Sequence, residues 1–186
     1  MKLEYFDRKE MKDIFIQDLS NLLFYEKLNR NFLEIVFLCI GTDHITGDCF
    51  GPLVGTRLLE LLKNENIFNI NVYGTLSENI CYTNVKKVIE QIKEKHKNAC
   101  IIVIDAALSD EQNIGKIFVK REKMQLGKGL YKEKLEVGNI AIKAVVGKNY
   151  KLSKYNFTSL QNVSLNNVIS LSDIVSEGII EVIKNI

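Results

Sequence analysis

Two aspartates, Asp48 and Asp105, each follow a run of apolar residues of the kind that forms a buried strand. Asp105 comes directly after residues 100–104, CIIVI, and Asp48 lies in the turn that follows residues 35–40. In an open α/β sheet, ligands bind beyond the carboxyl ends of the strands, where both aspartates are expected. If the two strands are neighbours, the carboxylates face one pocket. Because they cannot both ionise easily, one acts as an acid while the other polarises a water.

The turn that carries Asp48 is conformationally demanding. Residues 40–52, IGTDHITGDCFGP, contain three glycines and the only proline of the chain. Gly41 and Gly47 permit backbone angles that other residues reach only under strain, and Gly51 lets another backbone segment approach closely. Such a turn can hold a carboxylate in one orientation.

Plainer interpretations of the aspartates stay open. Asp48 could cap the helix that follows by accepting an N–H of its first turn. Asp43 and Asp48 could merely solvate an exposed turn, and Asp105 could anchor a loop at the end of its strand. Spacing alone does not decide between these roles and a functional pair.

Three common motifs for phosphate binding or nucleophilic catalysis are absent from the sequence. The pattern G-x-x-x-x-G-K-[ST] is not found, and the glycines of the turn do not form G-x-G-x-x-G. A nucleophile elbow, G-x-S-x-G, is also missing. The sequence therefore disfavours a phosphate-binding loop and a serine nucleophile of that type.

Strands and helices alternate along the chain in the pattern of a mostly parallel sheet with helices on both faces. Continuous apolar runs predict strands buried on both faces, and apolar residues at helical spacing predict amphipathic helices. A polar loop, residues 124–138, could fold over the pocket or be a plain surface excursion. Asn162 or Ser164 is expected to cap the last helix. The expected strands are residues 33–40, 67–73, 100–104, 115–121 and 139–146, and the expected helices are residues 8–28, 52–63, 84–97 and 165–183.

Length and composition predict one α/β domain. At 186 residues and 46% hydrophobic, the chain can bury one substantial core. We predict a single domain over residues 1–186, with residues 1–30 as an amino-terminal helical extension packed on it. Apolar segments stop far short of the roughly 20 residues needed to cross a bilayer. The amino terminus lacks the apolar centre of a secretory signal, so we expect no membrane association and a cytoplasmic location.

Cysteine spacing and charge distribution suggest no special partner. The four cysteines show no C-x-x-C spacing, which favours reduced, buried thiols. Residues 111–160 carry eleven Lys or Arg against four Glu, although the net charge of the whole chain is only +2. No recognised nucleic-acid motif accompanies these cations, so a solvated face is favoured and no nucleic-acid partner is expected.

Several segments of the chain resemble the YyaC family of sporulation proteins, over roughly residues 33–183. That family in turn resembles the germination protease of spore-forming bacteria, whose pattern G-N-x-x-V-T-P-D-A-L-G-P aligns with residues 41–52 without a gap. More distantly, the hydrogenase maturation endopeptidases are similar in fold. The resemblance implies a three-layer phosphorylase/hydrolase-like α/β fold, with Asp48 and Asp105 as the catalytic pair. The segments that carry it are CIGTDHITGDCFGPLVGTRLLELL, VYGTL, IIVIDAALS, LGKGLYKEKLEVGNIAIKAVV and LQNVSLNNVISLSDIVSEGIIE.

Some positions depart from these families. Gly47 replaces the proline of the germination protease, and Thr42 replaces its asparagine. The histidine that completes the metal site of the maturation enzymes has no evident counterpart, and two carboxylates alone would bind a metal weakly. We therefore expect no metal and no cofactor. The candidate substrate-binding residues are polar or glycine residues of the turn and of two later loops: Gly41, Thr42, Asp43, Thr46, Gly129 and Asn162.

Two functions follow from these observations, and a metal-dependent hydrolase is a third, less favoured alternative. One is a sporulation protein with a germination-protease-like site, in which Asp48 and Asp105 activate water to cut a spore protein. The other is a catalytically inactive scaffold of the same fold that binds a peptide or protein partner. A homo-oligomer is compatible with both.

Overall fold

The computed structural model describes residues 8–63, 65, 67, 69–126 and 135–185. Its centre is a five-stranded sheet in the order β2-β1-β3-β7-β4. Strands β2, β1, β3 and β7 run parallel to one another, and β4 pairs antiparallel with β7 at the edge. This is the mostly parallel sheet that the alternating pattern predicts. The strands are β1 (Glu34–Cys39), β2 (Ile70–Tyr73), β3 (Ala99–Ser109), β4 (Ile117–Lys120) and β7 (Ile140–Lys148).

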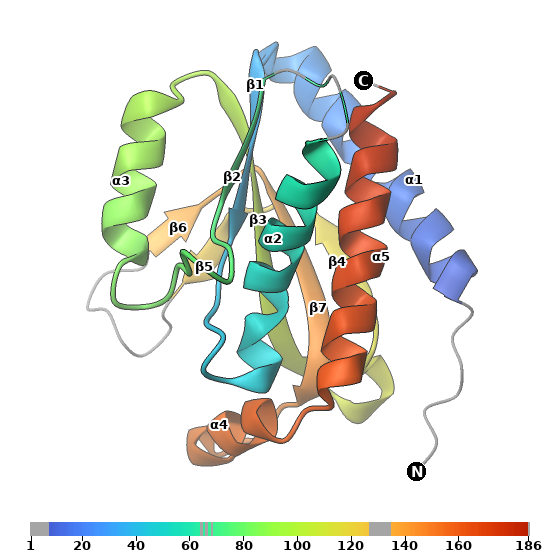
Figure 1. Cartoon of the computed structure of the whole chain (residues 1–186), viewed down its shortest axis with the longest axis vertical. Coiled ribbons are helices and arrows are strands. Elements are labelled where there is room, and N and C mark those ends of the chain that lie inside the picture. The colour runs from blue at the N-terminus through green and yellow to red at the C-terminus, as the bar shows by residue number, and fades with distance from the viewer. Residues whose placement is uncertain (1–7, 64, 66, 68, 127–134, 186) are drawn as a thin grey trace.

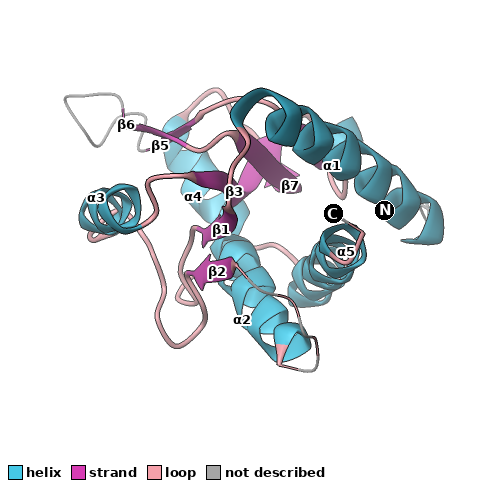
Figure 2. Cartoon of the chain, turned by 90° about the horizontal axis from the view of Figure 1, so that it is seen from above, coloured by secondary structure: helices cyan, strands magenta, loops and turns pink. Residues whose placement is uncertain are grey.

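Helices cover both faces of this sheet. On one face lie α2 (Phe50–Leu62), α5 (Leu165–Ile183) and α1 (Arg8–Arg30), and on the other lies α3 (Val85–Lys95) (Figures 1 and 2). The central strands are apolar on both sides because each face packs against its own cluster of buried side chains. In β1, for example, Phe37 belongs to the cluster under α2 and α5, whereas Val36 belongs to the cluster under α3.

The second face also carries a small antiparallel ribbon, β5 (Met124–Leu126) and β6 (Leu135–Val137). Residues 124–138 were expected to form a loop. This prediction is wrong at the two ends of the segment, which form β5 and β6. Met124, Leu126 and Val137 are buried beside α3 in the second apolar cluster. Both strands of the ribbon therefore pack against the apolar cluster under α3.

Two further features differ from the expected elements. Helix α4 (Ser153–Gln161) was not predicted, because its apolar residues are mostly exposed and leave no clear helical stripe. Strand β3 continues past Asp105 to Ser109, whereas the prediction ended it at residue 104. It continues because β7 runs beside it as far as Lys148, while β1 ends at Cys39 opposite Ile104.

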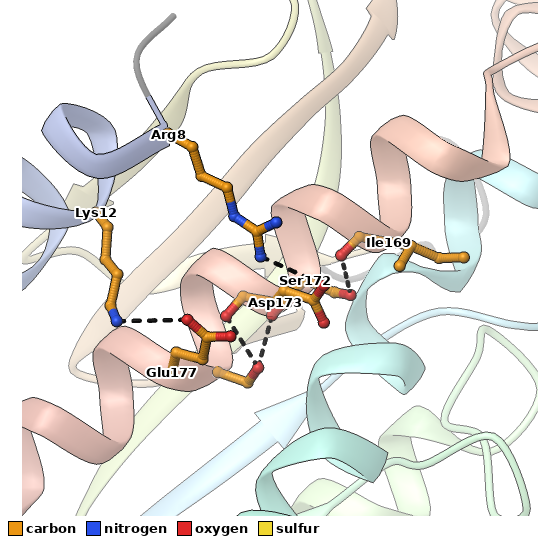
Figure 3. A network of polar contacts seen from close by, with 7 residues as sticks. Arg8, Lys12, Ile169, Ser172, Asp173 and Glu177 are labelled. Carbon is orange, nitrogen blue, oxygen red and sulfur yellow. Dashed lines mark hydrogen bonds and ion pairs between the residues drawn. The ribbon is translucent and has the colours of Figure 1, made fainter.

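Helix α1 packs along α5 through apolar and ionic contacts. Phe15, Leu19 and Leu23 are buried against the sheet cluster. Arg8 bonds Asp173 and Lys12 bonds Glu177 of α5, each at 3.4 Å (Figure 3). These contacts join the first turns of α1 to α5.

A buried carboxylate joins α1 to the edge of the sheet. Glu26 is 2% exposed, and its Oε1 accepts a hydrogen bond from Arg121 Nε at 2.7 Å. The guanidinium of Arg121 also lies 4.4 Å from the ring centre of Tyr25. Within the part of the chain that the structure describes, no helix combines the length and apolarity needed to cross a membrane.

The free cysteines agree with the expectation of buried thiols in the strands. Cys39 and Cys100 are buried, as is Cys49 in the turn. Burial raises the pKa of the Cys100 thiol to about 12, so it stays protonated and behaves as a small apolar side chain. Cys81 differs, since it is only half-buried at the mouth of a cavity.

Candidate functional site

A cavity of about 660 Å³ opens at the carboxyl end of β1, on the sheet face covered by α3 and the ribbon. Its walls come from segments far apart in the sequence: the end of β1 and its turn, the connection between β2 and α3, the middle of β3, and β5. Both Asp48 and Asp105 line it. The structure therefore brings the two predicted carboxylates to one space. The other lining residues are Ile40, Gly41, Thr42, His44, Ile45, Asn79, Cys81, Tyr82, Thr83, Val85, Gln125 and Leu126.

Asp48 sits in a short 3₁₀ turn, Thr46–Cys49, that leads into α2. Its Oδ2 accepts a hydrogen bond from the backbone N–H of Thr42 at 3.0 Å, across the turn. The residue at the N-cap of α2 is Cys49, and no side chain caps that helix. The alternative in which Asp48 serves as a helix cap is therefore wrong, and the carboxylate instead faces the cavity.

Two glycines allow the turn to close around this carboxylate. Gly41 has φ +141°, and a Cβ placed there would lie 1.9 Å from the carbonyl oxygen of Asp48. A Cβ on Gly51 would lie 2.1 Å from the carbonyl oxygen of Ile40. Any other residue at either position would push the turn away from the end of β1.

Asp105 reaches the same cavity from inside the sheet. It stands opposite Lys143 of β7 and just beyond the last residue of β1, so the neighbouring strand no longer covers its side chain. Burial, together with the nearby negative charge of Asp48, raises the pKa of Asp105 to about 8. The backbone N–H of Ala106 and the charge of Lys143 act in the opposite direction.

The pKa of Asp48 is also raised from its ordinary value, because the side chain is largely removed from water. The hydrogen bond from Thr42 opposes this shift by stabilising the charged form. Each carboxyl group thus has a backbone N–H that favours its charged form, but Asp105 is the more deeply buried and lies near the negative charge of Asp48. This difference favours the proton on Asp105 over Asp48.

The remaining candidate residues divide between this cavity and other places. Gly41 and Thr42 line the cavity. Asp43 accepts a hydrogen bond from Asn79 Nδ2 at 3.0 Å, so it supports a residue of the cavity wall. The carbonyl of Thr46 accepts the thiol of Cys49 at 2.9 Å inside the turn.

Two candidates lie away from the carboxylates. Asn162 lines a separate hollow between α4 and the start of α5, where it follows the last residue of α4. Ser164, the alternative cap, occupies the N-cap position of α5 without a side-chain hydrogen bond to the helix. Gly129 lies outside the described residues.

Sequence reasoning missed the wall formed by the connection between β2 and α3. Asn79, Cys81 and Thr83 belong to this segment, and Gln125 adds a further polar group from β5. Asn84 occupies the N-cap position of α3, and its side chain accepts the N–H of Cys81 at 2.9 Å and donates to the carbonyl of Asn79 at 3.0 Å. The position of this segment in the chain could have predicted its role. A segment that follows a parallel strand emerges at the same edge of the sheet as the carboxyl ends of the other strands.

The donor groups of the cavity do not form a metal site. Among the described residues, no three or more His, Cys, Asp or Glu side chains are arranged to hold a metal ion. His44 and Cys81 line the same cavity but do not complete such a group with the aspartates.

Comparison with known proteins identifies the family to which the chain belongs. The profile of a family described as "Protein of unknown function (DUF1256)" matches residues 5–178. "Uncharacterized protein YyaC" of Bacillus subtilis (strain 168) is 35% identical over 145 residues, which is 78% of this chain and 67% of that protein.

Two solved structures of hydrogenase maturation proteases are also similar. The [NiFe] hydrogenase maturation protease HycI from Thermococcus kodakarensis KOD1 matches with a TM-score of 0.57 and 18% identity, over 90% of this chain and 99% of that chain. HybD from Thermococcus kodakarensis matches with a TM-score of 0.44 and 13% identity, over 80% and 99% of the two chains. The similarity to HycI confirms the predicted α/β fold class.

Proposed function

The chain belongs to the family of proteins described as DUF1256, and from that premise we propose that it is an aspartate-dependent endopeptidase with Asp48 and Asp105 as its catalytic pair. One observation carries the proposal: both carboxyl groups line one cavity, where Asp105 favours its protonated form because it is buried and lies near the negative charge of Asp48. A carboxylic acid beside a carboxylate is the pair that general acid–base hydrolysis requires. The protease-like scaffold shared with HycI supports the same reaction class.

In the first step, Asp48 acts as the base because the Thr42 N–H stabilises its charged form. It takes a proton from a water whose oxygen attacks the carbonyl carbon of the peptide bond. Asp105 gives its proton to the carbonyl oxygen, so the addition produces a neutral diol without a free oxyanion. The protonation states required at the start are those that the site favours at neutral pH.

In the second step the two residues return to their starting states. The proton held by Asp48 passes to the amide nitrogen as the C–N bond breaks, and a hydroxyl of the diol returns a proton to Asp105. The products are a new carboxyl terminus and a free amine. Every proton transfer is made by this chain's own two carboxyl groups.

The dimensions of the cavity suit a peptide segment. Its volume of about 660 Å³ lies within the range of roughly 300–1,000 Å³ typical of sites for compact ligands. Apolar side chains such as Ile45 and Leu126 share the wall with amides such as Asn79 and Gln125, which can bond a peptide backbone. By resemblance to the YyaC family, we place the substrate among the proteins of a sporulating cell, in the cytoplasm or spore compartment.

Cleavage of spore proteins by the purified chain tests this function. Asp48→Asn and Asp105→Asn should each abolish new fragments in mass spectra, since each removes one proton-transfer group. Asp13→Asn makes the same chemical change on the exposed surface of α1 and should cleave like the parent chain. Circular dichroism would verify that all variants are folded.

Two outcomes would contradict the proposal. Cleavage that persists in both site variants would remove the aspartates from the mechanism. A stable complex with a spore protein and no new fragments would favour the alternative function, a catalytically inactive scaffold that binds its partner.

A further inference from the structure

An exposed surface surrounds α4, at the same edge of the sheet as the candidate site. Tyr150, Leu152, Tyr155 and Phe157 are between 43% and 59% exposed, which is high for large apolar side chains. They belong to α4 and the segment before it, at the lower end of the molecule in Figure 1. We call Lys148–Phe157 and the hollow beside it the α4 surface. Such a concentration of exposed aromatic side chains is typical of interaction sites.

Lysines alternate with the aromatic residues in this surface. Lys148 Nζ lies 5.7 Å from the ring centre of Tyr150, and Lys154 Nζ lies 5.0 Å from that of Tyr155. Between Glu136 and Asp173 the chain contains no acidic residue. Glu111 pairs with Lys148 at 3.1 Å, and Asp110 also lies near this lysine. These two acidic residues offset only part of the charge of Lys148, Lys151 and Lys154, so the α4 surface is positively charged.

The surface is ordered before any partner binds. Asn156 Oδ1 accepts the backbone N–H of Tyr150 at 2.6 Å, and Asn156 Nδ2 donates to Asn149 Oδ1 at 3.0 Å. Ser159 Oγ donates to the carbonyl of Lys148 at 2.8 Å. These bonds hold the segment before α4 against the helix, so binding would cost little ordering of the backbone.

A hollow of about 480 Å³ lies beside the two tyrosines, whose ring centres are 6.0 Å apart. Hydroxyl and amide groups of Ser159, Asn162 and Asn167 contribute to its wall. Tyr, Ser and Asn side chains are well suited to contact peptide groups, since they combine flat apolar area with adaptable hydrogen bonding. A surface that only inserted into lipid would gain nothing from a hollow lined by amides.

Helix α4 also packs directly against the turn that carries Asp48. A Cβ on Gly47 would lie 2.9 Å from the carbonyl oxygen of Leu160 in α4, so the helix and the 3₁₀ turn are in close contact. This contact gives a physical reason for glycine at the position where the germination protease has proline. A partner bound on the α4 surface would lie at the same end of the molecule as the cavity.

We infer that the α4 surface is a docking site for an acidic segment of a partner protein that also carries apolar or aromatic side chains. The lysines would pair with the carboxylates of the segment, and Tyr155 and Phe157 would pack on its apolar groups. This inference concerns binding and does not require that the candidate site cleave peptides.

Binding of a labelled acidic copolymer, poly(Glu,Tyr), to the full chain tests the inference by fluorescence anisotropy. Lys148→Gln, Lys151→Gln and Lys154→Gln combined should weaken binding about tenfold, given the modest strength of each exposed ion pair. Lys86→Gln, Lys87→Gln and Lys93→Gln combined remove the same charge from exposed positions of α3 and should leave the affinity unchanged.

The aromatic contribution has its own test. Tyr155→Ala with Phe157→Ala should weaken binding of poly(Glu,Tyr) roughly tenfold. Plain polyglutamate should bind the parent chain more weakly than the copolymer. Asp48→Asn should bind like the parent, which separates failure of the docking surface from failure of the proposed catalysis. Circular dichroism of each variant would confirm that the loss is local.

Three results would overturn the inference. The first is equal loss of binding in the α3 control, because the attraction would then be general charge. The second is tighter binding of an oligothymidine of fifteen nucleotides than of the copolymer. The third is stronger adsorption to phosphatidylglycerol vesicles than to the copolymer, since the surface would then recognise lipid.

Discussion

Asp105→Asn should change how the stability of the protein depends on pH. The folded-state pKa of Asp105 is about 8, against 3.8 for the ordinary carboxyl group. Between these values the folded state holds a proton that the unfolded state has released. The contribution of protonated Asp105 to the free energy of unfolding is therefore complete below pH 3.8. It decreases as the pH rises from 3.8 and is lost as the pH passes through 8.

The size of the effect follows from the two pKa values. From pH 6 to pH 8 the unfolded carboxyl stays ionised, while the folded one goes from about one per cent to about half ionised. The linkage relation then gives a loss of about 2 kcal/mol in the free energy of unfolding over this interval. An amide side chain does not titrate in this range, so the Asp105→Asn variant should lack this component.

Urea denaturation at pH 6 and pH 8 measures the effect directly. The parent should lose about 2 kcal/mol more than Asp105→Asn between the two pH values. Asp48→Asn should lower the pKa of Asp105 by removing a nearby negative charge, and it should therefore reduce the loss seen in the parent.

A matched control and a clear negative result complete the experiment. Asp13→Asn changes an exposed carboxyl on α1 and should keep the pH dependence of the parent. Equal pH dependence in the parent and in Asp105→Asn, within about 0.5 kcal/mol, would refute the reasoning. It would mean that Asp105 is ionised in the folded protein at neutral pH and cannot serve as the acid.

Three substitutions test how the scaffold holds the site. Gly41→Ala should destabilise the fold by about 2 kcal/mol or more in urea titration and lower any cleavage, because φ is +141° and the new Cβ would meet backbone at 1.9 Å; a neutral effect would show that the turn can relax. Glu26→Gln should lower the urea midpoint of unfolding, since it removes the charge of a buried carboxylate that accepts a hydrogen bond from Arg121 at 2.7 Å; an unchanged unfolding midpoint would mean that the ion pair contributes little. Gly178→Ala should cost about 1–3 kcal/mol and make α1 more sensitive to protease, because its Cβ would lie 2.6 Å from the ring of Phe15; equal digestion rates would show that Phe15 repacks freely.

Much of the fold was predictable from local pattern. The runs at residues 35–40 and 100–104 are apolar throughout because both faces of β1 and β3 are covered, and continuous apolar runs predict such strands. The helical spacing of apolar residues located α1, α2, α3 and α5. The order of these elements predicted a mostly parallel sheet, since parallel strands need a crossover between them.

The site was only partly predictable. Glycines and a proline around Asp48 indicated a turn that holds a carboxylate, and the apolar run before Asp105 placed it near a carboxyl end. The wall residues Asn79 and Cys81 carried no such pattern. Helix α4 was also missed, because its few apolar residues, Tyr155, Phe157 and Leu160, do not recur at regular helical spacing.

The amino-acid sequence by itself determined most strands of the central sheet, most helices and the turn around Asp48, because these depend on residues close together in the chain. Only the tertiary structure decided that β1 lies beside β3 and ends one residue short of Asp105. That pairing leaves Asp105 uncovered at the cavity and within electrostatic reach of Asp48. The proton affinity of a carboxyl group depends on burial and on charges brought near by folding, and neither is encoded in local spacing.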